Sequence, residues 1–112
     1  MNNVCAEVVP WSAVCFHAQQ AAEKYLKAAL VACGLTPPYT HDLTDLLTRA
    51  ADIAPSLAAF VDEADLLSVY AVDIRYPDFV GIVTADDGRE ALRAARKIKD
   101  GVIQLLPGTH TV

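Results

Sequence analysis

The sequence predicts an all-α protein, an antiparallel up-and-down bundle of about four helices. Of its 112 residues, 54 % are hydrophobic, and much of that share is Ala and Leu, which favour helices. In four stretches the apolar residues recur every three or four positions, which is the period of a helix buried on one side. Pro and Gly separate these stretches, and short connections favour antiparallel neighbours.

The composition limits what this single domain (1–112) can do. The net charge of −5 argues against broad binding to nucleic-acid phosphates but leaves room for a local basic patch. No apolar run reaches the roughly 20 residues that cross a membrane, so we expect a cytoplasmic protein without a membrane span. We expect an irregular N-terminus at 1–11 and a loose tail at 107–112.

The three cysteines are Cys5, Cys15 and Cys33, and their spacing matches neither a zinc knuckle nor a redox pair. Cytoplasmic thiols stay reduced. We therefore expect all three to be buried structural residues.

The first predicted helix runs from about Ser12, as its N-cap, to about Cys33, with Gly34 ending it. At about 100° per residue, its apolar face consists of Cys15, Ala18, Ala22, Tyr25, Leu26, Ala29 and Cys33. Its opposite, polar face consists of His17, Gln20, Lys24 and Lys27. A stiff connector with Pro37 and Pro38 follows.

Two more helices follow that connector. The second takes Thr40 as its N-cap and ends near Ala54, and its apolar residues are Leu43, Leu46, Leu47 and Ala50. The third begins at Pro55 and continues to about Ile74, because proline is tolerated at the start of a helix. Its main apolar face consists of Leu57, Phe60, Val61, Ala64, Leu67, Ala71 and Ile74.

The fourth helix begins after Thr84, which forms a capping box with Asp87, and runs to about Leu106. Its expected core face is Ala91, Leu92, Ala95, Ile98, Val102, Leu105 and Leu106. Its expected solvent face is Arg89, Arg93, Arg96, Lys97 and Gln104. Acidic residues are interspersed among these cations, so we interpret them as a solvated surface.

Two polar groups are candidate sites, each with a purely structural alternative. The polar stripe of the first helix is either a solvated face, with an ion pair between Glu23 and Lys27, or a groove for a phosphate or nucleotide. Arg75 either caps the end of the third helix or recognises an anion, with Tyr76 as a stacking surface.

Motifs for other chemistry are missing from the sequence. It contains no phosphate-cradling glycine loop, nucleophile elbow, HExxH or CxxC. A metal site would need His17, His41 and a carboxylate, because the third histidine, His110, lies in the expected tail. We expect no metal and no cofactor.

The segment Cys15-Phe16-His17-Ala18-Gln19-Gln20-Ala21-Ala22-Glu23-Lys24-Tyr25-Leu26-Lys27 resembles the signature of HEPN domains (higher eukaryotes and prokaryotes nucleotide-binding). Three further pieces occur in that family's order: Thr40-His41-Asp42-Leu43, Arg75-Tyr76-Pro77-Asp78 and the last helical region, Glu90 to Leu106. The resemblance covers about residues 14–106. It implies a helical bundle that dimerises, binds nucleotide or RNA, and pairs with a minimal nucleotidyltransferase in toxin–antitoxin-like systems.

The sequence departs from the family pattern in two places. HEPN ribonucleases carry Arg, then four to six residues, then His, whereas Val80, Gly81 and Ile82 stand at those positions after Arg75. The usual long first helix also has no counterpart, because Met1 to Trp11 is short and contains Pro10. We expect a subunit or partner to cover the face that this helix would occupy.

Three functional hypotheses follow. The leading one is a dimeric binding and assembly module, the partner of a minimal nucleotidyltransferase, that holds nucleotide or RNA through Arg75, Tyr76, Lys24, Lys27, His17 and Gln20. The second is a metal-independent ribonuclease that uses Arg75 with His17 or His41 across a dimer. The third is a remnant that only self-associates. The missing ribonuclease motif favours a protein that is not an enzyme.

Overall fold

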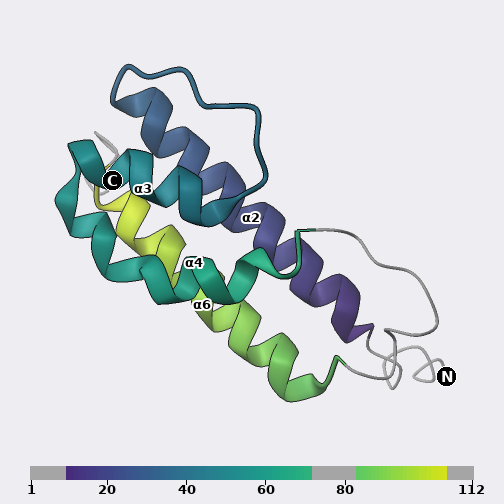
Figure 1. Cartoon of the computed structure of the whole chain (residues 1–112). Coiled ribbons are helices and arrows are strands. Elements are labelled where there is room, and N and C mark those ends of the chain that lie inside the picture. Colours follow the sequence, from purple (N-terminus) through teal and green to yellow (C-terminus); the bar gives the residue numbers. More distant parts are fainter. Residues whose placement is uncertain (1–9, 72–82, 106–112) are drawn as a thin grey trace, which may run out of the picture.

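The computed structural model describes residues 10–71 and 83–105, and every regular element in these ranges is helical (Figure 1). The elements are α2 (Trp11–Ala32), α3 (Leu43–Ile53), the 3₁₀ helix η1 (Pro55–Phe60), α4 (Val61–Ser68) and α6 (Ala85–Ile103). They pack around one apolar core, so the prediction of an all-α bundle is confirmed. No helix in the described ranges is long and apolar enough to cross a membrane.

Helix α2 is the longest element, and it stops where the sequence predicts. Gly34 has a φ of 84°, a conformation that glycine adopts without strain. The backbone N–H of Leu35 donates to the Leu30 carbonyl and that of Gly34 to the Val31 carbonyl, both at 2.9 Å. At the other end Pro10 is the N-cap, so Ser12 lies in the first turn and is not the cap.

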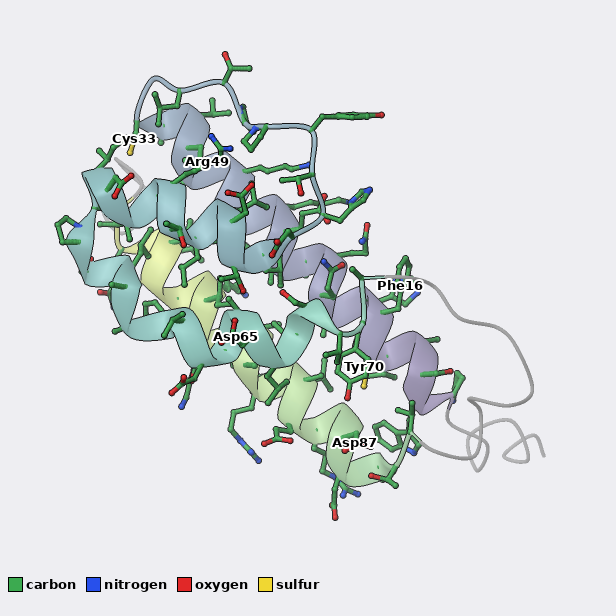
Figure 2. The ribbon with its side chains drawn as sticks, in the orientation of Figure 1. Phe16, Cys33, Arg49, Asp65, Tyr70 and Asp87 are labelled. Atoms are coloured by element: carbon green, nitrogen blue, oxygen red, sulfur yellow. The ribbon has the colours of Figure 1, made fainter. Side chains whose placement is uncertain are left out.

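The expected burial of the cysteines is only partly correct. Cys15 is buried, but Cys33 is exposed, because it follows the last turn of α2, beyond the residues that neighbouring helices cover. Cys5 lies outside the described residues. Tyr70, after α4, points toward the N-terminal halves of α2 and α6 and hydrogen-bonds to Cys15 (Figure 2). Burial, with Cys15 and Asp87 nearby, raises the pKa of Tyr70 to about 12.

The connector between α2 and α3 returns along α2 before α3 begins (Figure 1). His41, just before α3, is hydrogen-bonded to Gln19 in the middle of α2, whereas Ile53, the last residue of α3, shares a hollow with Leu30. Helices α2 and α3 therefore run in the same direction. The direction then reverses between α3 and α4 and again between α4 and α6, so α4 is antiparallel to both of these neighbours, whereas the parallel α2 and α3 differ from the predicted up-and-down order.

The start of α3 and the shape of the third helical segment both differ from prediction. Asp42, not Thr40, caps α3, because its side chain accepts the backbone N–H groups of Thr44 and Asp45. The segment expected as one helix divides at Phe60 into η1 and α4. Val61 was expected in the core but is 42 % exposed, because the chain turns at Phe60. Ile74 lies outside the described residues.

Helix α6 has the predicted capping box, in which Thr84 and Asp87 each accept a backbone N–H from the other. It ends at Ile103, and Leu92 and Leu105 are exposed, contrary to prediction, whereas Ala94 is buried. The helix buries small residues, so its neighbours approach closely. A Cβ on Gly88 would overlap the Trp11 ring, and one on Gly101 would overlap Phe60.

Candidate functional site

The outer face of α2 carries a shallow hollow lined by polar and aromatic side chains. His17, Gln20 and Lys24 line it together with Tyr25 and two alanines, Ala21 and Ala28. These residues meet because positions three, four and seven apart lie on one side of a helix. Three of the six residues expected to bind a nucleotide therefore share one hollow: His17, Gln20 and Lys24.

Lys27, a fourth expected binding residue, is not among the residues that line the hollow. Its Nζ lies 3.0 Å from the Glu23 carboxylate, one turn earlier on α2. The ion pair considered as the structural alternative is therefore present in the structure. The pair is more than a surface contact, because the side chain of Glu23 is only 8 % exposed.

A buried polar network joins the two motif segments that contain Glu23 and His41. Nδ1 of His41 lies 2.9 Å from Oε1 and 3.1 Å from Oε2 of Glu23. The buried amide of Gln19 donates to the backbone carbonyl of His41 at 3.0 Å, and Gln20 donates to the Gln19 side chain at 2.7 Å. The network fastens the connector to α2 just before α3 begins.

The pKa of Glu23 is the net result of opposing effects. Burial alone would raise it, but hydrogen bonds from His41 and Lys27, and the charges of these two groups, lower it below its ordinary value of 4.5. The carboxylate therefore stays ionised at neutral pH and holds both partners in place.

Sequence reasoning placed Glu23 on the polar stripe, as a solvated ion pair or part of a ligand groove, and did not identify Gln19 as part of a site. One signal was available, because Gln19 follows Cys15 by four residues and Glu23 precedes Leu26 by three, so both border the apolar face. The covering connector could not be inferred from α2 alone.

The two remaining expected site residues, Arg75 and Tyr76, lie outside the described residues, as does His110. Lys24 forms no ion pair with any described residue, so its charge is available to a ligand. Within the described ranges, no group of three or more His, Cys, Asp or Glu side chains could hold a metal ion.

The cations of α6 are exposed, and some of them are paired. Arg89 lies 3.0 Å from Asp86 and has its guanidinium carbon 5.8 Å from the centre of the Trp11 ring. Lys97 lies 3.6 Å from Glu63 on α4. These contacts are consistent with the solvated surface expected for this helix.

The bundle and the polar face of α2 define a small helical module with a polar hollow on its outer side. Comparison with protein-family models identifies the family: the HEPN domain model matches residues 3–104, and the chain belongs to the HEPN family. This membership supports a nucleotide- or RNA-related role. Comparisons with curated proteins and with solved structures found no significant match.

Proposed function

We propose that this protein is a HEPN binding and assembly module that binds a nucleotide or RNA on the outer face of α2. The observation that carries the proposal is the hollow shared by His17, Gln20, Lys24 and Tyr25. Lys24 supplies charge for a phosphate, Gln20 and His17 supply hydrogen bonds, and Tyr25 offers an aromatic surface for a base. Arg75 and Tyr76 complete this site in the proposal.

Charge limits the size of the ligand. The net charge is −5, and Lys24 is the cation that lines the hollow. In a plot of the logarithm of affinity against the logarithm of salt concentration, each neutralised phosphate of a single strand contributes about −0.7 to the slope. We expect a total slope of about −1 to −2, typical of a nucleotide or a short single-stranded segment.

The substitution Lys24→Glu tests the site, and Lys99→Glu is its matched control. Both make the same charge change at an exposed helical position, but Lys99 lies on α6. We expect Lys24→Glu and Arg75→Ala to weaken binding of a labelled single-stranded RNA at least about tenfold, the effect of losing a charged hydrogen bond. Fluorescence anisotropy at several salt concentrations measures this, and circular dichroism checks the fold. Equal affinities for Lys24→Glu, Lys99→Glu and wild type would refute the site.

The assembly part of the proposal consists of a homodimer and a minimal nucleotidyltransferase partner in a toxin–antitoxin-like pair. Exposed apolar side chains support it, because contiguous apolar surface often marks a protein interface. Several of them gather where α2, α3 and α6 end, and they are Val31, Leu35, Ile53 and Leu105.

A metal-independent ribonuclease is the second candidate, and the Glu23–His41 pair favours it. A carboxylate that orients an imidazole is a common arrangement for a general base. His41 would take the proton of a ribose 2′-hydroxyl as its oxygen attacks the adjacent phosphorus. The 5′-oxygen would leave with a proton from a second group such as His17 of another subunit.

Cleavage of a labelled RNA in the presence of a chelator tests this second candidate. We expect activity to fall by at least about a hundredfold in His41→Ala if the imidazole is the base. His17→Ala and Arg75→Ala test the other expected groups. Cleavage no faster than that by a mock preparation would exclude the ribonuclease.

A further inference from the structure

His41 is fixed through one of its two ring nitrogens. Nδ1 contacts both carboxylate oxygens of Glu23, and the backbone carbonyl of the same residue accepts a hydrogen bond from Gln19. The other nitrogen, Nε2, has no hydrogen-bond partner among the described residues, and the side chain is 70 % exposed. The ring is therefore anchored on its protein side and open to solvent.

This anchor is a costly way to attach a connector. Gln19 is fully buried and Glu23 is nearly so, and taking an amide and a carboxylate out of water is unfavourable unless each is fully hydrogen-bonded. Apolar contacts would attach the connector without that cost. The network provides a fixed orientation of the His41 ring, as carboxylates do for imidazoles in metal and catalytic sites.

The Glu23 carboxylate also decides what Nε2 can bind. An ionised carboxylate only accepts hydrogen bonds, so the proton of a neutral His41 ring lies on Nδ1 and Nε2 is an acceptor. When the ring is protonated, Nε2 is a donor. A hydroxyl group can pair with either form, because it both donates and accepts, whereas a phosphate oxygen pairs only with the protonated ring.

His41 lies at the edge of the polar face that contains the hollow. Gln20 lines the hollow and also hydrogen-bonds to Gln19, which holds the His41 backbone. Lys27 shares the Glu23 carboxylate with His41 and is partly exposed. Nε2 of His41 can accept a hydrogen bond from a ligand hydroxyl, and cationic side chains lie nearby. A ribose in a nucleotide fits this arrangement, because its hydroxyls lie next to phosphate esters.

We propose that His41, oriented by Glu23, binds a ribose hydroxyl of the ligand, so that this face of α2 selects ribonucleotides over deoxyribonucleotides. Glu23 is the positioning residue, and His41 is the specificity-determining residue. The inference rests on the proposed nucleotide- or RNA-binding function, and it adds the sugar to what that function specifies.

The test compares the affinities of the full chain for a fluorescent oligouridine and for its 2′-deoxy counterpart of the same length. We expect wild type to bind the ribo form about three- to tenfold more tightly, the effect of one neutral hydrogen bond. His41→Ala should reduce this ratio to about one while the deoxy form keeps its wild-type affinity. Gel analysis after each titration shows that the RNA is intact.

Variants of Glu23 separate positioning from folding. Glu23→Gln has an amide oxygen that can still accept the Nδ1 proton, so the ribo-to-deoxy affinity ratio should be kept. Glu23→Leu removes the acceptor and frees the ring, so this ratio should fall to about one. Circular dichroism identifies the variants that remain helical. A ribo-to-deoxy ratio of one in wild type, or a ratio unchanged in folded His41→Ala, overturns the inference although binding persists. Failure of the chain to bind either oligonucleotide refutes the proposed function itself.

Discussion

At the scale of single residues, Glu23 links the fold to the candidate site. It is a nearly buried carboxylate whose charge is balanced by Lys27 on its own helix and by His41 on the connector. Removing one partner would leave a buried charge with fewer hydrogen bonds, which is more costly than never burying it. Under the proposal, stability and ligand binding therefore depend on the same carboxylate.

This sharing predicts a pH dependence of stability. The folded-state pKa of Glu23 is lowered, so its stabilising contribution is present above the ordinary value of 4.5 and is lost as the pH falls through the lower folded-state value. At neutral pH we expect Glu23→Gln to lower the free energy of unfolding by about 1 kcal/mol. Urea unfolding of both proteins across the acidic range measures the difference, which should shrink toward low pH. A difference that stays constant or grows toward acid would contradict this interpretation.

The polar residues also show where sequence reasoning ends. His17, Gln20 and Lys24 were identified as neighbours because one helix fixes their spacing. The sequence did not show that Glu23 is covered, because the helical wheel says nothing about a connector that folds back over α2. Which polar residue is covered depends on the path of residues about twenty positions away, and no local pattern records that path.

At the scale of elements, α6 determines how closely the helices approach. Its buried face is made of Gly88, several alanines, Ile98 and Val102, and its two glycines receive Trp11 and Phe60. Glycine inside a helix costs about 1 kcal/mol relative to alanine, so its presence here is explained by the aromatic rings that occupy the space. The glycines let the Trp11 ring of α2 and the Phe60 ring of η1 lie close to the α6 backbone.

A double-mutant cycle tests this contact. Gly88→Ala improves helix propensity but overlaps the Trp11 ring, so we expect it to destabilise the protein by roughly 1–2 kcal/mol. In a Trp11→Leu background the overlap is removed, and the same change should stabilise the protein by up to about 1 kcal/mol. Thermal or urea unfolding of the four proteins gives the cycle. The same sign in both backgrounds would show that Trp11 does not set the requirement for glycine.

At the scale of the whole molecule, the common direction of α2, α3 and α6 gathers their C-termini at one end (Figure 1). None of the three helices has a basic residue in its last turn, so the partial negative charges of the helix ends are not offset there. Ile53 is 47 % exposed at this end and borders two hollows. Apolar side chains therefore lie at this end beside the helix C-termini, and Arg49 and Asp52 line one of the two hollows with them.

We predict that the proposed dimer uses this end, so Ile53→Asp should dissociate it. The new carboxylate would lie in an apolar contact and beside negative helix poles, and both effects are unfavourable. Val69→Asp is the control, because Val69 is 71 % exposed and follows α4, away from this end. Sedimentation equilibrium should show a dimer for wild type and Val69→Asp and a monomer for Ile53→Asp. A wild-type monomer at high concentration would exclude the dimer.

The sequence by itself determined the first and last helices, the Gly34 stop and the Thr84–Asp87 capping box, because each depends on residues within a few positions of one another. It also determined the family, because the motifs that carry the resemblance occur in the family's order along the chain. Only the tertiary structure decided the direction of α3, the pairing of Glu23 with His41 and the insertion of Trp11 against Gly88. These features join segments far apart in the chain. The free energies of these interactions depend on which two surfaces meet. Helical periodicity describes one surface at a time, so it does not predict them.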